Sequence, residues 1–331
     1  MPFGIRSLAA TGLAAASLAA VLGLAPQATH AADYPSRPIT LVVPSTPGGG
    51  TDTQARILAS KMGELLGQPV IIDNKGGASG NIGAQFVAKA PADGYTLLAM
   101  ISSHTINPYV LKSVPYDIDR DFTLITRTVT APGVLVGHPS VPARTLPELI
   151  AYAKANPGKV TFSSAGSGSL SHLAMELFSQ AAGIKLQHVP YRATAQALTD
   201  VIADHVNLMM SDLGAAQGYI RNGGLRSFGV SSAARSPEAP DLPTLAESGL
   251  PGFEAVQWFG LAAPAGTPPD IVQKLFAAAS QALNDPATKE KYNAAAMTPA
   301  PSASPEDYAK FVRAEGQRWR KVVQDARIVA E

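Results

Sequence analysis

Two spacings of apolar residues alternate along the chain from residue 39 onward. Short runs of β-branched and apolar residues, such as Ile39–Pro44, are typical of buried strands. They are followed by segments such as Ala55–Leu66, in which apolar residues recur every three or four positions, as in amphipathic helices. A chain that alternates such strands and helices predicts parallel sheets covered by helices on both faces, the α/β class.

The same pattern continues to the end of the chain. Further strands are expected at 70–72, 95–100, 160–163, 188–191, 206–210 and 258–263, and further helices at 82–90, 146–155, 170–182, 194–203, 271–284 and 307–329. Because no strand follows the last helices, we expect them to return to the first of two domains. The prediction is a first domain of residues 32–134 plus 256–331, a second domain of residues 135–255, and a hinged cleft between them.

The first 31 residues have a different pattern, that of a secretory signal peptide. Residues 1–6 carry one positive charge, residues 7–24 are almost wholly apolar, and Thr29-His30-Ala31 places small residues before a cleavage point. A membrane anchor is the alternative, since about 18 apolar residues can reach across a bilayer. The cleavage site favours removal, and the prediction is an exported protein of about 300 residues.

Composition excludes several classes of function. The net charge of +1 and the absence of a Lys/Arg run argue against nucleic-acid binding. With no Cys, the chain has no thiolate zinc site, Cys nucleophile or disulfide. Its His residues lack metal-site spacing, so we expect no metal. The glycine-rich segments match neither nucleotide motif, G-x-G-x-x-G or the P-loop, so we expect no cofactor.

Three Gly-rich turns, at residues 47–52, 76–83 and 166–171, each join an expected strand to an expected helix. Backbone N–H groups at such a junction lack helical partners, the helix dipole adds partial positive charge, and glycine lets a ligand approach closely. A carboxylate or phosphate is the natural ligand. In the alternative reading, Gly and Ser merely end the strands. Three such turns in one chain favour anion binding.

Single residues in these regions have two readings each. Asp52 is either a ligand contact or a helix charge paired with Arg56 one turn later. Asp212 ends an expected strand, where it either caps a helix or faces the cleft and accepts a hydrogen bond from a ligand's amine, amide or hydroxyl. Ser167 and His172 suggest a nucleophile and base, but Ala165 breaks the G-x-S-x-G elbow. Trp258 and Phe259 are expected in the core.

Several motifs, read together, resemble one family. They are Tyr34-Pro35-Ser36-Arg37-Pro38 with the Pro44–Asp52 loop, Gly76-Gly77-Ala78-Ser79-Gly80-Asn81, Pro91-Ala92-Asp93-Gly94-Tyr95, Ser164–His172, His188-Val189-Pro190-Tyr191 and Leu242-Pro243-Thr244-Leu245. In combination they are similar to the tripartite tricarboxylate transporter solute-binding proteins, the Bug or TctC-like family of the bacterial periplasm. The sequence departs from the usual family pattern at Ala193 and at Ala203-Asp204.

The resemblance implies a type II periplasmic binding protein fold, with two doubly wound domains that close around a ligand in the manner of a Venus flytrap. It implies a small carboxylate ligand (a di- or tricarboxylate, an aromatic acid or an amino acid) and delivery to a membrane transporter or a sensor protein. The predicted ligand-binding residues are Thr46, Gly48, Gly49, Asp52, Asn81, Ser164, Gly166, Gly168, Ser169, His172 and Asp212.

We therefore expect a periplasmic, monomeric receptor that is not an enzyme. The alternative is an α/β hydrolase-like or other small-molecule enzyme that uses the same Gly/Ser loops.

Overall fold

The computed structural model describes residues 34–191 and 193–328. The predicted signal peptide lies outside the described residues. The chain divides into a unit of residues 1–34 and a unit of residues 35–331, and every helix and strand below belongs to the second unit.

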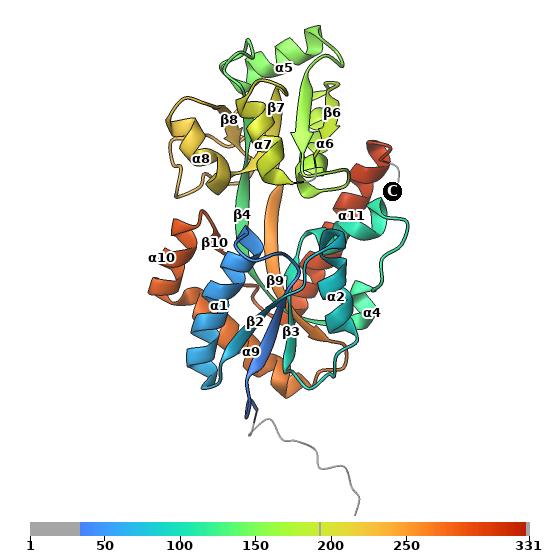
Figure 1. The fold of residues 1–331 in the computed structure, drawn as a ribbon, viewed down its shortest axis with the longest axis vertical. Helices are drawn as coiled ribbons and strands as arrows, with labels where there is room; N and C mark the ends of the chain where they lie inside the picture. Colours follow the sequence, from blue (N-terminus) through green and yellow to red (C-terminus); the bar gives the residue numbers. More distant parts are fainter. Residues whose placement is uncertain (1–33, 192, 329–331) are drawn as a thin grey trace, which may run out of the picture. The chain divides into compact units, whose positions relative to one another are not determined.

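Strands and helices alternate over most of this unit (Figure 1). The strands are β1 (Ile39–Val43), β2 (Val70–Asn74), β3 (Thr96–Ile101), β4 (Phe122–Gly137), β5 (Thr161–Ser164), β6 (Gln187–Pro190), β7 (Leu208–Asp212), β8 (Arg226–Val230), β9 (Val256–Pro264) and β10 (Thr298–Pro299). The helices are α1 (Gly50–Leu66), η2 (Ala78–Gly80), α2 (Asn81–Ala88), α3 (Ser103–Val110), α4 (Ile118–Asp121), α5 (Leu146–Ala155), α6 (Leu170–Ala182), α7 (Thr194–Ile202), α8 (Leu213–Arg221), α9 (Pro269–Asn284), α10 (Pro286–Ala294) and α11 (Pro305–Asp325).

The strands form a ten-stranded sheet in the order β2-β1-β3-β9-β4-β7-β5-β6, with β8 and β10 also paired to β4. The expectation of parallel sheets is only partly right. Strand β1 pairs in parallel with β2 and β3, and β5 with β6 and β7. Strands β4 and β9, in contrast, are antiparallel to their neighbours. The sequence pattern predicted β9 as a strand but revealed neither β4 nor the antiparallel pairings, because these pairings join segments far apart in sequence.

Strand β4 belongs to two groups of strands. Its residues Phe122–Pro132 pair with β9 and β10, whereas Gly133–Gly137 pair with β7 and β8. The first strand set is therefore β1, β2, β3, β9, β10 and the first part of β4. The second strand set is β5, β6, β7, β8 and the last part of β4. In Figure 1, β4 and β9 are the strands drawn between the two sets.

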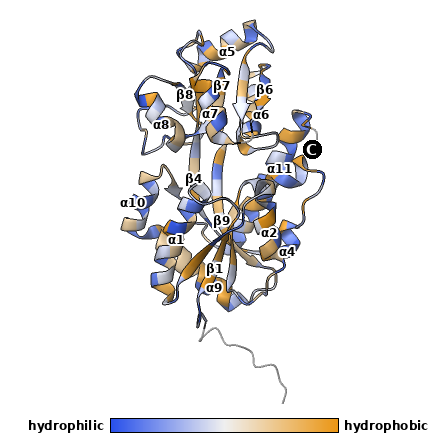
Figure 2. Ribbon diagram, viewed as in Figure 1, coloured by the Kyte–Doolittle hydropathy of each residue, from blue (hydrophilic) through white to orange (hydrophobic). Residues whose placement is uncertain are grey.

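Apolar residues concentrate on the strands and on the inner faces of the helices, as Figure 2 shows for the strands around β1 and β9. One buried cluster joins the first set to Tyr308 and Val312 of α11. Another joins Phe162 of β5 and Phe178 of α6 to Trp319, further along α11. A single helix thus contributes to the cores on both strand sets.

A buried carboxylate holds α11 at this junction. Glu315, in the middle of the helix, is 8% exposed. One of its oxygens accepts hydrogen bonds from the indole N–H of Trp258 in β9 and from that of Trp319, both at 3.1 Å. Its other oxygen lies 3.2 Å from Arg318. A charge this buried requires such partners, so this cluster ties the helix to the crossing strand.

Helices α5 and α6 match the expected ranges, whereas α3, α4, α8 and α10 were not predicted. The hydroxyl of Thr145 caps α5, and Gly183, in the left-handed conformation at φ 61, ends α6. Within residues 34–191 and 193–328, no helix combines the length and the hydrophobicity that a membrane span requires.

Candidate functional site

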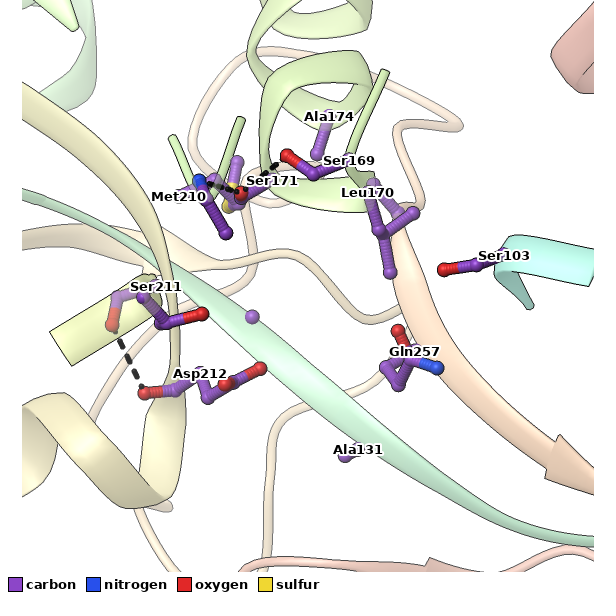
Figure 3. A pocket seen from close by; sticks show the side chains of 14 residues that line it. Ser103, Ala131, Ser169, Leu170, Ser171, Ala174, Met210, Ser211, Asp212 and Gln257 are labelled. Atoms are coloured by element: carbon purple, nitrogen blue, oxygen red, sulfur yellow. Dashed lines mark hydrogen bonds between the residues drawn. The ribbon is translucent and has the colours of Figure 1, made fainter. Parts of the chain in front are cut away.

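A cavity of about 210 Å³ lies where the two strand sets meet. Its walls come from both sets and from the crossing strands. The lining residues are Ser103, Ala131, Gly133, Ala165, Ser169, Leu170, Ser171, Ala174, Thr194, Met210, Ser211, Asp212, Ala255 and Gln257. Figure 3 shows the serine side chains of α6 on one side of this space and Asp212 and Gln257 on the other. Polar side chains predominate in its walls, and the apolar side chains include those of Leu170 and Met210.

A second cavity of about 400 Å³ adjoins the first. The two share Ser103, Ala131, Asp212 and Gln257 in their walls. The second cavity is also lined by Gly50 and Thr51 at the start of α1. Its larger apolar lining residues are Ile101, Pro132, Leu213, Phe259 and Met297. Phe259 was expected in the core; it is buried, but it also lines this cavity.

Helices α1, α3, α6, α7 and α8 all begin at the walls of these cavities. Each N-terminus presents amide N–H groups without helical partners and about half a positive charge. In α6 the hydroxyl of Ser169 accepts from the amide of His172, and the amides of Leu170 and Ser171, in the first turn, have no acceptor within the helix. The combined walls therefore favour an anion, although no Lys, Arg or His among the described residues lines them.

Asp212 stands where the two cavities meet. It precedes α8 at the N-cap position, yet its side chain makes no capping hydrogen bond, so the capping reading is not supported. The carboxylate is open to solvent and has no ion-pair partner among the described residues. The surrounding protein nevertheless displaces enough water to raise the pKa of its carboxyl above the ordinary value. Asp212 is therefore an unpaired acceptor that faces the cavity.

Neutral groups support the Ser/Gly loop between β5 and α6. The ring of His172 stacks on that of His188, with centroids 3.8 Å apart. The amide of Gly168 donates to Nδ1 of His172 at 3.0 Å, and Nε2 of His188 lies 2.6 Å from Oγ of Ser164. Burial and the neighbouring His172 lower the pKa of His188 to about 4. At neutral pH the uncharged ring of His188 thus supports the loop through Ser164 and by stacking on His172.

Gly168 occupies a position in this loop that requires glycine. Its φ is +75°, in the left-handed region. A Cβ placed there would lie 2.8 Å from a methyl carbon of Val110 in α3. The backbone therefore packs closely against α3, which follows β3 of the first strand set, so a helix outside the second strand set also positions the Ser/Gly loop.

Charged groups support the Gly-rich loop before α1. The carboxylate of Asp52 accepts from the amide of Gly48 at 2.9 Å, from Nε of Arg56 at 2.8 Å and from the amide group of Asn74 at 2.9 Å. The hydrogen bonds from Arg56, Gly48 and Asn74 lower the pKa of Asp52 to about 2, against the opposing effect of burial. The predicted pair with Arg56 is confirmed, and the carboxylate holds the loop from beneath.

The third turn is held by α3. Ala78 and Ser79 both have positive φ, at 47° and 55°. The side-chain amide of Asn107 donates to the carbonyl of Ser79 at 3.0 Å and to Oδ1 of Asn81 at 2.6 Å. His104 Nε2 lies 3.3 Å from the carbonyl of Gly80, and burial lowers the pKa of this histidine to about 4. These contacts stabilise a strained turn, which is a common feature near functional sites.

The predicted site residues fall into three groups. Ser169 and Asp212 line a cavity. Thr46, Gly48 and Gly49 are exposed on the loop before α1, next to the lining residues Gly50 and Thr51. The others, Asp52, Asn81, Ser164, Gly166, Gly168 and His172, form or hold the three loops. Whether each contacts a ligand stays a prediction.

Sequence reasoning missed several lining residues. Ser103 begins α3 directly after β3, and Gln257 lies in β9, between the two strand sets. The end of the strand before Ser103 was a usable signal, since ligands bind at the carboxyl ends of parallel strands. The sequence around Gln257 carried no such signal, because the position of this residue depends on the antiparallel pairing of β9 with β4.

The geometry does not favour a serine nucleophile. Among the described residues, Ser164 is the serine whose hydroxyl contacts a histidine ring, and this residue is buried beneath the loop. Among the described residues, no cluster of His, Asp and Glu is arranged to hold a metal ion.

Comparison with known proteins decides the family. The family model of the tripartite tricarboxylate transporter family receptor matches residues 54–328. The chain belongs to this receptor family, TctC. Its role is that of a solute-binding protein, and the resemblance found in its motifs is confirmed.

Relatives of this TctC receptor match over most of their length. Protein BugT of Bordetella pertussis is 38% identical over 294 residues, which cover 88% of this chain and 90% of BugT. A structure from R. palustris with adipate has a TM-score of 0.80 and 37% identity, covering 90% of this chain and 100% of that one. MatC from Rhodopseudomonas palustris, with bound malate, has a TM-score of 0.74 and 33% identity over 88% of this chain and 100% of its own. The predicted two-domain binding fold is that of these neighbours.

Proposed function

We propose that this receptor captures a small carboxylate in the two adjoining cavities. The observation that supports this most directly is the convergence of helix N-termini on cavities that no described Lys, Arg or His lines. Such walls bind an anion through backbone N–H groups and serine hydroxyls. The adipate and malate bound to the two structural neighbours are of the same chemical class.

The proposed mechanism is closure of a hinge. We assign residues 32–134 and 256–331 to one domain and residues 135–255 to the other, connected through β4 and β9 at the change of pairing partners. Loops from both sides contribute to the cavity walls, and only the closed state satisfies both sets of donors. A carboxylate therefore stabilises that state. The predicted ligand-binding residues, from Thr46 to Asp212, belong to this proposal.

The proposed setting is the periplasm, after removal of the signal peptide at residues 1–31. The receptor acts as a monomer, without cofactor, and delivers its ligand to transporter subunits or to a sensor protein. It is not an enzyme: the buried Ser164 offers no accessible nucleophile, which weighs against the hydrolase-like alternative.

The experiment is a thermal-shift and titration screen of the mature protein, unfolded and refolded to remove any ligand. Its panel is pentanoate, succinate, glutarate, adipate, malate, several amino acids and inorganic phosphate. A carboxylate at 100 times its Kd stabilises the native state by about 2.7 kcal/mol, several degrees for a chain of this size. No shift with any carboxylate, in protein shown to be folded, would contradict the proposal.

A matched pair of variants tests the location. Leu170→Asp places a carboxylate in the first turn of α6, at the cavity wall, and Ser167→Asp places one at an exposed position in the same loop. We expect the first to lower carboxylate affinity by about 100-fold or more through like-charge repulsion, and the second to change it less than about 3-fold. Equal effects would place the ligand elsewhere.

A further inference from the structure

The strongest constraint on the ligand is the charge of the cavity walls. Asp212 is the one ionisable side chain among the described residues that line either cavity. It belongs to both walls, so a ligand that occupies the adjoining space passes close to its carboxylate. The positive potential in the cavities comes from helix N-termini. These bind a carboxylate, but they do not form a full ion pair with Asp212.

The neighbours of Asp212 add acceptors rather than cations. The side-chain nitrogen of Gln257 donates to the carbonyl of Trp258 at 3.4 Å, so the amide oxygen of Gln257 remains as an acceptor. Figure 3 shows the Asp212 carboxylate extending toward the side of the cavity where Gln257 lies. The hydroxyl of Ser211 is turned to the backbone carbonyl of Asp212, at 3.4 Å. Beside the amide N–H groups at the start of α8, the side chains of this part of the wall are acceptors, and no described one carries a positive charge.

The opposite part of the first cavity has the reverse character. The amides of Leu170 and Ser171 and the hydroxyl of Ser169 present donors. The start of α6 therefore suits a carboxylate, and the unpaired carboxylate of Asp212, between the two cavities, suits a positively charged donor. A second carboxylate at Asp212 would place two anions together with no described side chain to neutralise them, whereas an ammonium group there would form a charge-assisted hydrogen bond.

We infer that the ligand of this receptor is an amino-carboxylate, a zwitterion whose carboxylate binds at the start of α6 and whose ammonium group binds Asp212. This inference rests on the proposed function and narrows it from carboxylates in general to those that carry an amine. The apolar walls of the second cavity, with Phe259 and Met297, leave room for an aliphatic part of the same molecule.

The test compares matched ligands. One set is pentanoate, 5-aminopentanoate and glutarate, which differ only at the far end of the chain. The other is pentanoate, 2-aminopentanoate and 2-hydroxypentanoate, which differ beside the carboxylate. Titration calorimetry on the refolded, ligand-free protein measures each Kd. We expect an amino-carboxylate of at least one set to bind about 10-fold or more tightly than every other member of that set.

Two variants assign the effect to one carboxylate. Asp212→Asn keeps the shape and removes the charge, and Asp241→Asn makes the same change at an exposed residue outside both cavities. In Asp212→Asn we expect the affinity for the amino-carboxylate to fall about 10-fold or more. The affinity for pentanoate should change less than about 3-fold, which would show that the carboxylate subsite is intact. Asp241→Asn is expected to change neither of these two affinities.

The outcomes separate this inference from the proposed function. Tightest binding of glutarate by the wild type, or an equal loss of all ligands in Asp212→Asn, would overturn the amino-carboxylate assignment and leave carboxylate capture standing. Binding of none of these ligands, nor of any other carboxylate, would overturn both.

Discussion

The loops before α1 and α6 occupy equivalent places, each between a parallel strand and a helix, but different forces hold them. Beneath the first, a buried Asp52 carboxylate accepts from a loop amide, an arginine and an asparagine. Beneath the second, two stacked imidazoles contact an amide and a serine hydroxyl, and the pKa of one of them, His188, is lowered to about 4. The comparison teaches that the same anion-binding geometry can rest on a charged carboxylate or on stacked rings. The two loops should then respond differently to mutation and to pH.

The largest expected effect comes from Gly168→Ala. The alanine would have to adopt a positive φ, and its Cβ would lie 2.8 Å from a methyl carbon of Val110. Left-handed backbone and overpacking together cost about 2–4 kcal/mol of unfolding free energy. We also expect carboxylate affinity to fall about 30-fold or more, since the Ser/Gly loop must move. Chemical denaturation and titration calorimetry measure the two effects.

Gly48→Ala is the control for this prediction. Gly48 also has a positive φ, of 87°, but a Cβ there would meet no atom within 4 Å. We expect Gly48→Ala to lose only the cost of the left-handed backbone, about 1–2 kcal/mol of unfolding free energy. An equal loss in both variants would show that the contact with Val110 contributes nothing.

The next effect tests the charged loop. Asp52→Asn removes the acceptor charge that serves Gly48 and Arg56, and we expect a loss of about 1.5–3 kcal/mol of unfolding free energy. Arg56→Gln, which removes the half-exposed partner only, should lose less, since Asp52 keeps its bonds to Gly48 and Asn74. Denaturant midpoints of the three proteins measure this. A greater loss in Arg56→Gln would mean that the ion pair, rather than the carboxylate, holds the loop.

A third prediction uses pH to separate the loops. The pKa of His188, and that of His104 in the third turn, is lowered from 6.5 to about 4, so the folded state binds fewer protons than the unfolded state between these values. Their contribution to stability is complete above pH 6.5 and is lost as the pH falls toward 4, by up to about 3 kcal/mol for each histidine. The pKa of Asp52 is lowered from 3.8 to about 2, so its contribution is lost only below pH 3.8.

The measurement is the unfolding free energy from pH 7 to pH 3 in the wild type and in His188→Gln. The wild type should lose stability between pH 6.5 and pH 4. His188→Gln should lose less over this interval, because only His104 then titrates with a lowered pKa. A variant with the full wild-type slope would show that His188 does not have a lowered pKa in the folded protein.

The smallest effect concerns the Ser169 hydroxyl. It accepts from the amide of His172 and lies 3.1 Å from Oγ of Ser171. Loss of a helix cap costs about 1 kcal/mol, so we expect this from Ser169→Ala, together with a few-fold loss of carboxylate affinity. Ser167→Ala, at an exposed position of the same loop, is expected to change stability by less than about 0.5 kcal/mol. Thermal unfolding with and without a carboxylate measures both.

Local patterns predicted the parts of this fold that local interactions determine. Helices α5 and α6 have the expected bounds because an N-cap and an apolar face specify them within their own sequence. The Gly-rich turns were recognised for the same reason. The 16-residue strand β4 was not predicted, since it depends on pairing with β7, β8, β9 and β10, which lie far along the chain.

The site divides in a similar way. The motifs identified the loops, but they could not show that Asp52 points beneath its loop while Asp212 faces a cavity. That difference follows from tertiary neighbours: Arg56 and Asn74 satisfy the first carboxylate, and no described side chain pairs with the second. Gln257 and Ser103 carry no motif, and only the crossing of β9 and the end of β3 bring them to the cavity.

The carboxylate of Glu315 has a spectroscopic consequence. Trp258 and Trp319 are the two tryptophans of the whole chain, and both indoles donate to the same oxygen of that side chain. One indole sits on the strand that crosses between the strand sets, the other in the core of the second set. All tryptophan emission therefore originates at the junction about which closure would turn. The protein carries its own optical probe for that movement, with no added label and no background from elsewhere in the molecule.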